Sequence, residues 1–251
     1  MIGPAALRVE DLDDRVVITL ARPEQRNAID QQMVTELHAA CARLEEQPKV
    51  ALIVGDGDTF AAGADIAQLR ERRLSDALRG INSSIFDRIR RLPMPTIALL
   101  DGYALGGGAE LAYACDFRLG TLRVKIGNPE PGLGILAAAG ASWRLAELVG
   151  EPVAKEILLA ARVLDAGEAH DVHLLNEVVD PGTPEDLLAA GHAWADRIAK
   201  QAPLAIRLSK SVFHAPRDAH PLIDDIAQAI LFETDDKHDR MTAFLERRKK
   251  R

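Results

Sequence analysis

Two short runs of the chain, Val50–Val54 and Thr96–Leu100, are almost entirely apolar and rich in β-branched residues. A strand with one face in water alternates apolar and polar residues, whereas a strand covered on both faces is apolar throughout. We therefore expect two buried strands of a parallel sheet. Each run is followed by a loop of small residues and then by a helical pattern. This alternation predicts an α/β protein with ligand sites where loops leave the strands.

The flanking segments fit the same plan. Leu7–Leu20 is expected to form two strands around a turn at Asp13–Asp14, and a helical spacing of apolar residues begins near Asp30. From Pro152 onward, helical patterns dominate. The segments expected to be loops or bends are 60–65, 101–108 and 124–134.

Charge and composition exclude several classes of protein. The net charge of −7 disfavours a nucleic-acid-binding surface. The sequence has no run of about 18 apolar residues, so no membrane-spanning helix is expected. The first 14 residues lack the features of a secretory signal, so a cytoplasmic protein is expected. Neither the two cysteines, Cys41 and Cys115, nor the seven histidines have metal-ligand spacing, and no metal site is expected.

The loop after the second apolar run contains three consecutive glycines, Gly106–Gly108, followed by Ala109 and Glu110. Glycine permits close approach to the backbone, and the first N–H groups of a helix lack intrahelical partners. Together they suit an oxyanion. The alternative is a tight turn that needs glycine for its shape alone.

A second loop, "FAAGADI" at 60–66, follows the first apolar run. Its small residues also leave backbone N–H groups accessible, and Asp65 could cap the helix that follows. Since each loop joins a buried strand to a helix, the two loops are interpreted as halves of one oxyanion hole.

Two glutamates lie close to these loops in sequence. Glu110 falls in the first turn of an apolar helix, where a charge is costly without a partner or a function, although it could also complement the helix dipole. Glu130 lies in the loop "GNPEPGLG" and, taken alone, reads as a solvated acid. Two acids beside one oxyanion site would indicate general acid–base chemistry.

The order of "FAAGADI", "GYALGGGAELAYACDFRL" and "NPEPGLGI" resembles the crotonase superfamily, the enoyl-CoA hydratases and isomerases. The resemblance covers nearly the whole chain, from "LARPEQRNAI" to the C-terminal helix. It implies an α/β fold, a spiral of ββα repeats over residues 1–195, with a helical region at 196–251 that assembles homotrimers or homohexamers. It also implies an acyl-CoA thioester substrate, with coenzyme A as part of the substrate and no separate cofactor.

The resemblance also implies roles for individual residues. The backbone N–H groups of Ala64 and Gly107 would hold the thioester oxygen, Glu110 would activate water, and Glu130 would deliver a proton to the α-carbon. The residues implied to contact coenzyme A are Arg22, Arg26, Ala61, Ala62, Ala64, Asp65, Ile66 and Arg247.

The chain departs from the family pattern at Leu136–Gly140, where many members carry Pro-Gly-x-Gly-Gly. This difference is expected to alter the acyl pocket. The favoured function is hydration of a 2-trans-enoyl-CoA because both glutamates are retained. The alternatives are an enoyl-CoA isomerase, another acyl-CoA-transforming member, or a catalytically idle CoA-binding scaffold.

Overall fold

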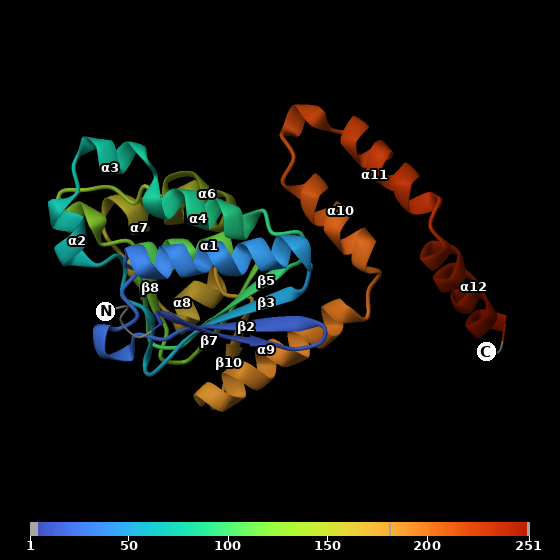
Figure 1. The fold of residues 1–251 in the computed structure, drawn as a ribbon, viewed down its shortest axis with the longest axis horizontal. Coiled ribbons are helices and arrows are strands. Elements are labelled where there is room, and N and C mark those ends of the chain that lie inside the picture. The colour runs from blue at the N-terminus through green and yellow to red at the C-terminus, as the bar shows by residue number, and fades with distance from the viewer. Residues whose placement is uncertain (1–4, 181, 250–251) are drawn as a thin grey trace. The chain divides into compact units, whose positions relative to one another are not determined.

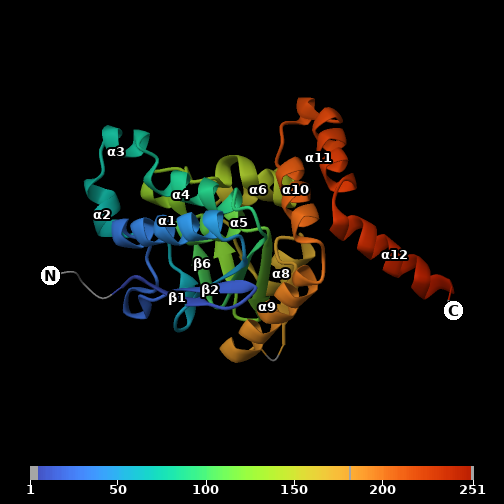
Figure 2. The same cartoon turned by 45° about the vertical axis from the view of Figure 1, so that its right-hand side comes forward.

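The computed structural model describes residues 5–180 and 182–249 and divides the chain into two units, Met1–Ala195 and Asp196–Arg251. The first unit carries every strand, and the second consists of helices and one short 3-10 turn. Figures 1 and 2 show the elements of both units.

Two sheets organise the first unit. The larger sheet has the strand order β1-β2-β3-β5-β7-β10, and the smaller has the order β4-β6-β8-β9. Only β1 with β2 and β8 with β9 pair antiparallel; the other pairs are parallel. The strands are β1 (Leu7–Asp11), β2 (Arg15–Leu20), β3 (Val50–Gly55), β4 (Thr59–Ala61), β5 (Thr96–Leu100), β6 (Tyr103–Leu105), β7 (Phe117–Thr121), β8 (Lys125–Gly127), β9 (Val163–Asp165) and β10 (Glu177–Val179).

The helices follow the strands in a repeating order. In the first unit they are α1 (Gln31–Glu46), α2 (Ile66–Glu71), α3 (Leu74–Leu78), α4 (Ile81–Arg90), α5 (Gly107–Ala114), α6 (Ala141–Val149), α7 (Glu151–Leu159) and α8 (Ala166–Asp171). Helix α9 (Pro184–Ala199) ends beyond the unit boundary, and the second unit contains α10 (Pro203–Phe213), α11 (Leu222–Phe232) and α12 (Asp235–Lys249).

Three successive strand–strand–helix units form the centre of the fold. In the pairs β3–β4, β5–β6 and β7–β8, the first strand joins the larger sheet and the second joins the smaller one. Helices follow each pair, so the chain winds through both sheets repeatedly. This arrangement confirms the predicted α/β class and the spiral of ββα units.

Buried strands and an amphipathic helix build the core. Every residue of β5 is buried, as its unbroken apolar run predicts. Helix α1 begins after Asp30, whose side chain accepts a hydrogen bond of 2.8 Å from Met33 N, and its buried stripe includes Leu37, Cys41 and Leu44. Helices α1 and α4 lie beside each other in both views.

Three expected loops contain short strands that the sequence analysis missed. Segment 60–65 includes part of β4, 101–108 contains β6, and 124–134 contains β8 and a 3-10 turn. Each strand has three residues and pairs only with segments distant in sequence. Such strands are too short to show a period-two pattern, so their partners, not their local sequence, determine them.

Candidate active site

The loops after β4 and β6 and the turn after β8 meet around one cavity of about 570 Å³. Ala64 lies in the first loop, Gly107 and Glu110 on α5, and Glu130 in the turn; all four line this cavity. The structure therefore brings together the four residues that the sequence predicted for catalysis. Residues on α2–α4 and the segment 133–139 form other parts of the wall.

Two backbone N–H groups, of Ala64 and Gly107, lie close together where the two loops meet. A methyl group built on Gly107 would lie 3.4 Å from the nitrogen of Ala64, so the two positions are close. Among the hydrogen bonds of the described residues, none uses either N–H group as a donor. Gly107 is the first residue of α5, where the helix leaves N–H groups without internal partners. The pair is suited to a shared oxygen acceptor.

The neighbouring glycines serve different purposes. Gly106 has φ +53° and ψ −123°, a conformation that residues with a side chain rarely adopt, and a Cβ there would lie 3.1 Å from Glu130 Oε1. A Cβ on Gly108 would lie 2.1 Å from the carbonyl oxygen of Ala61. Gly106 therefore forms the turn, and Gly108 lets α5 approach β4.

Backbone hydrogen bonds from residues 26–29 hold the first loop in place. Ile29 donates to Gly63 O at 2.8 Å and accepts from Asp65 N at 3.2 Å, while Ala62 donates to Arg26 O at 3.0 Å. The Asp65 side chain accepts from Gln68 N at 2.9 Å, which confirms the predicted cap of α2.

Glu110 is a buried carboxylate held by backbone donors. Its Oε1 atom accepts hydrogen bonds of 2.7 Å from Ala139 N and 3.1 Å from Ala141 N. Burial raises the pKa of Glu110 to about 7; the N–H groups of Ala141 and Ala139 oppose the rise, and the charge of Glu130 adds to it. A carboxylate with this pKa can accept a proton near neutral pH.

Glu130 is also buried, so its reading in isolation as a solvated loop acid is wrong. Its Oε1 atom accepts a hydrogen bond of 3.4 Å from Asn128 Nδ2, whereas Oε2 is buried without a hydrogen-bond partner among the described residues. Burial raises the pKa of Glu130, and hydrogen bonds from its own backbone and from Asn128 oppose the rise. Glu130 therefore holds its proton to a higher pH than a solvated glutamate does, and its Oε2 atom has no protein partner among the described residues.

Asn128 was not among the residues singled out from the sequence. Its side chain contacts Glu130 and accepts a hydrogen bond of 3.1 Å from the hydroxyl of Tyr113. Both Asn128 and Tyr113 are fully buried. The signal that could have identified Asn128 is its place two residues before Glu130 in a loop bracketed by prolines. A buried amide needs hydrogen-bond partners for its donors and its acceptor, and Glu130 is a nearby acceptor.

The residues expected to contact coenzyme A are not all gathered at the cavity. Ala62, Ala64 and Ile66 line it, but Ala61 is fully buried behind it. Arg22 turns inward: its guanidinium pairs with Asp30 at 2.8 Å and donates to Ala28 O at 2.8 Å.

The remaining expected CoA contacts lie outside the cavity lining. Arg26 is exposed, and Asp65 serves as a helix cap. Arg247 lies in the C-terminal unit. Contacts from Arg22, Arg26 and Arg247 to coenzyme A therefore stay predictions.

Two further properties bear on the class of site. Within residues 5–180 and 182–249, no three His, Cys, Asp or Glu side chains gather as metal ligands would. None of the helices in those ranges is long and apolar enough to cross a bilayer.

Comparison with known proteins gives the family. The enoyl-CoA hydratase/isomerase family model matches residues 15–251. The chain belongs to the enoyl-CoA hydratase/isomerase family. The match includes both loops and both glutamates of the cavity.

Individual members of the enoyl-CoA hydratase/isomerase family resemble the chain over nearly its full length. A crotonyl-CoA hydratase of Syntrophomonas wolfei is 37% identical, covering 96% of this chain and 95% of its own. A short-chain-enoyl-CoA hydratase of Clostridium acetobutylicum is 34% identical, covering 93% and 92%. The crystal structure of an enoyl-CoA hydratase from Bacillus anthracis superposes with a TM-score of 0.89 at 28% identity, covering 96% of each chain.

Proposed function

We propose that the protein is an enoyl-CoA hydratase that adds water across a 2-trans-enoyl-CoA to give a 3-hydroxyacyl-CoA. One observation carries the proposal: two buried glutamates, Glu110 and Glu130, line the same cavity as the unused N–H groups of Ala64 and Gly107. The hydratase names of relatives that match nearly the whole chain support the same reaction.

The N–H pair is the proposed site of the thioester oxygen. When water adds to C3 of the enoyl group, the C2–C3 π electrons move toward the thioester carbonyl and make an enolate oxygen. Donors fixed at that oxygen stabilise the negative charge as it develops, and loss of one such donor typically lowers the rate about 10²–10³-fold. Ala64 and Gly107 would provide these donors without rearrangement.

The two glutamates divide the proton transfers. Ionised Glu110 takes a proton from water as the water oxygen bonds to C3. Protonated Glu130 gives its proton to C2, which becomes the new C–H bond of the product. The proton left on Glu110 must then return to Glu130 or to solvent before the next turnover. Burial raises the pKa of both carboxyl groups, and the charge of Glu130 adds to the rise at Glu110, so the pair does not release its two protons together.

The reaction needs no separate cofactor, because hydration is not a redox step and the chain itself supplies the oxyanion donors and proton carriers. Coenzyme A enters as part of the substrate. Isomerisation of the double bond requires a proton to be moved between carbons and can use a single acid. The second buried acid therefore favours hydration over isomerisation and over an idle CoA-binding scaffold.

The test measures loss of the enoyl-thioester absorbance with crotonyl-CoA and longer 2-trans-enoyl-CoAs. Wild type is compared with Glu110→Gln and Glu130→Gln, and with Glu46→Gln on the exposed surface of α1 as the matched control. Each site variant is expected to lower kcat about 10²–10⁴-fold, the usual contribution of a general acid or base. A wild type that binds these thioesters without hydrating them contradicts the proposal.

We also propose that residues 196–251 assemble the chain into homotrimers or homohexamers. Helices α10–α12 expose several large apolar side chains, among them Phe213, Leu222 and Phe244. Contiguous exposed apolar surface is typical of interfaces between protein chains. Analytical ultracentrifugation is expected to give a mass three or six times that of the chain, and a monomer at all concentrations contradicts this assembly.

A further inference from the structure

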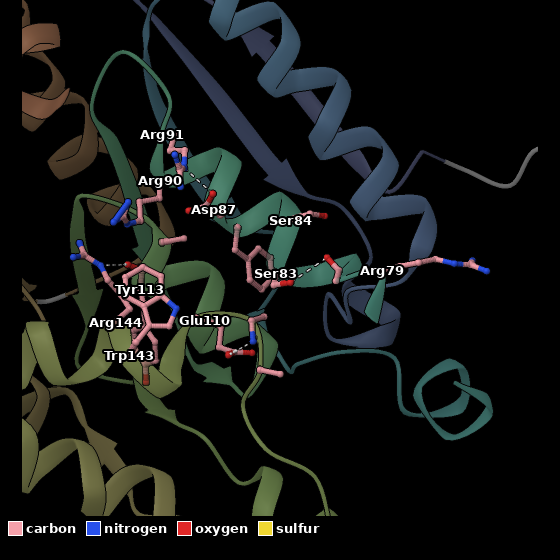
Figure 3. A pocket seen from close by; sticks show the side chains of 16 residues that line it. Arg79, Ser83, Ser84, Asp87, Arg90, Arg91, Glu110, Tyr113, Trp143 and Arg144 are labelled. Atoms are coloured by element: carbon pink, nitrogen blue, oxygen red, sulfur yellow. Dashed lines mark hydrogen bonds and ion pairs between the residues drawn. The ribbon is translucent and has the colours of Figure 1, made fainter. Parts of the chain in front are cut away.

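A second cavity, of about 420 Å³, adjoins the first at Glu110. Neither Ala64 nor Gly107 lines the second cavity, so it lies beyond the oxyanion pair. Figure 3 shows the side chains around it, with Glu110 among them. The residues common to both cavities are Gly80, Ser83, Glu110, Ala138 and Ala139.

The position of the second cavity suits the far end of an acyl chain. In the proposed reaction the thioester oxygen is held in the first cavity and C3 lies at Glu110, so C4 and later carbons continue past Glu110. The rings of Phe86, Tyr113 and Trp143 contribute to the wall and can pack against methylene groups.

The charged lining of this cavity is unusual for a site that would bind an apolar acyl chain. Its lining includes four arginines, and most have carboxylate partners. Arg91 pairs with Asp87 at 2.7 Å, and Arg144 pairs with Glu147 at 2.9 Å. Arg79 lies 3.7 Å from Asp76 and extends away from the other three arginines in Figure 3.

Arg90 is the exception. It has no ion pair or hydrogen bond to any residue within 5–180 or 182–249, and its Nε atom is buried without a partner. Its guanidinium lies over the ring of Trp143, 5.0 Å from the centroid. Burial and the nearby charge of Arg144 lower the pKa of Arg90, and the more distant carboxylates of Asp87 and Glu147 oppose this without forming an ion pair with it. A partly buried cation is costly without a partner.

We propose that Arg90 binds a carboxylate at the far end of the acyl chain, so that the preferred substrate is a 2-enoyl-CoA with a terminal carboxyl group. This inference rests on the proposed hydratase function. A planar guanidinium can hold a carboxylate through two parallel hydrogen bonds, a geometry that a hydrocarbon tail cannot use. The guanidinium of Arg90 lies over the ring of Trp143, whose face attracts a cation.

Binding of unreactive ligands tests the inference directly. Isothermal titration calorimetry compares saturated acyl-CoAs that end in a carboxylate (glutaryl-, adipyl-, suberyl- and sebacyl-CoA) with fatty acyl-CoAs of equal carbon number. Wild type is expected to bind the terminal carboxylate at least tenfold more tightly than its matched partner at one or more lengths. Equal or weaker binding at every length overturns the inference, and this comparison requires no variant.

Variants then assign the effect to Arg90. Arg90→Met keeps the length and removes the charge, so it should abolish the preference; Arg90→Lys, which keeps a charge without the planar fork, should retain part of it. Arg91→Met is the matched control, because Arg91 lies next in sequence, is exposed and is paired with Asp87. A preference that survives Arg90→Met, or that is lost equally in Arg91→Met, contradicts the assignment.

Hydration of crotonyl-CoA, which has no terminal carboxylate, separates this inference from the proposed function. If crotonyl-CoA is hydrated and no terminal carboxylate is preferred, the hydratase proposal stands and the Arg90 site fails. If no thioester is hydrated but Arg90-dependent binding persists, the Arg90 site stands and the hydratase proposal fails.

Discussion

The carboxylate of Glu110 accepts a hydrogen bond of 2.7 Å from the backbone N–H of Ala139, 29 residues further along the chain. Ala139 belongs to the stretch 136–140, where the sequence departs from the common family pattern. The departure thus changes side chains around the cavity, while its backbone still orients the proposed base.

Glu110→Gln is expected to raise thermal stability while lowering activity. The folded-state pKa of Glu110 is raised by burial to about 7, so the folded protein binds the proton more tightly than the unfolded chain. Between the unfolded pKa and about 7, stability therefore falls as pH rises, and the penalty is complete above that range. Glutamine removes the penalty and still accepts a hydrogen bond.

Differential scanning fluorimetry across pH 5 to 9 measures this effect. The melting temperature of Glu110→Gln should exceed that of wild type above about pH 7, by an amount corresponding to roughly 1–3 kcal/mol, and converge with it near pH 5. A gap that widens toward acid would contradict the sign. Glu46→Gln, at an exposed position of α1, is the control.

The pH dependence of hydration should follow the same pKa. Since Glu110 must be ionised to accept a proton, kcat/KM should fall as pH decreases through about 7. The requirement for protonated Glu130 should produce a second decline at higher pH. Steady-state rates with crotonyl-CoA at constant ionic strength would reveal the profile, and an acid limb at the ordinary glutamate pKa would refute this assignment.

The adjacent glycines Gly107 and Gly108 should respond differently to alanine. At Gly107 the added methyl group meets ordinary contact distances but lies 3.4 Å from Ala64 N, where the thioester oxygen is proposed to bind. Gly107→Ala should fold and lose about 10²-fold in kcat/KM. At Gly108 the methyl group would approach Ala61 O to 2.1 Å, so Gly108→Ala should lose stability instead.

Melting temperature and crotonyl-CoA kinetics, measured on both variants, distinguish these outcomes. A Gly107→Ala protein with normal kcat/KM would show that the N–H pair does not hold the reacting oxygen.

Asn128→Ala should displace the pH profile. The Asn128 side chain donates to the carboxylate of Glu130 and so lowers its pKa; removing it should raise that pKa and move the high-pH limb upward. We expect about a tenfold loss of kcat with a small change in KM. Tyr113→Phe, which removes the partner on the other side of Asn128, should shift the limb in the same direction but less. An unchanged profile would leave Asn128 with a structural role only.

Arg118→Met should destabilise the fold without entering the chemistry. The buried guanidinium donates to Leu174 O and Cys115 O, each at 2.7 Å, and to Ala112 O at 3.3 Å. Burial lowers the pKa of Arg118 to about 10, yet the carbonyl groups around it would lose their donors if it were removed. A loss of about 3–5 kcal/mol is expected from chemical denaturation. A change below about 1 kcal/mol would contradict this account.

The sequence predicted the elements whose stability is local. The apolar run of β5 and the start of α1 near Asp30 were predicted because burial on two faces and a helical spacing of apolar residues leave direct patterns. Strands β4, β6 and β8 were missed because each has three residues and pairs across the spiral. Helix α6 begins at Ala141, directly after residues that line the cavity.

The candidate site was predictable where a motif carries the chemistry. The two loops, Glu110 and Glu130 were singled out from the residues, the family resemblance implied their roles, and the structure places them around one cavity. Arg90 was not found, because a charged residue on an amphipathic helix is usually a solvated one. Arg90 is distinguished only by its contacts: Arg91 and Arg144 form ion pairs with acidic side chains, and Arg90 does not.

The two backbone hydrogen bonds to the Glu110 carboxylate have an evolutionary consequence. Because its partners at 139 and 141 are main-chain N–H groups, the contact uses no side-chain atom of either residue. Mutation of Ile135, Leu136 or Ala138, which line the cavity beside them, can then diversify substrate choice while leaving the reaction intact. Descendants of such a chain could acquire new acyl preferences through single substitutions, without passing through an inactive intermediate.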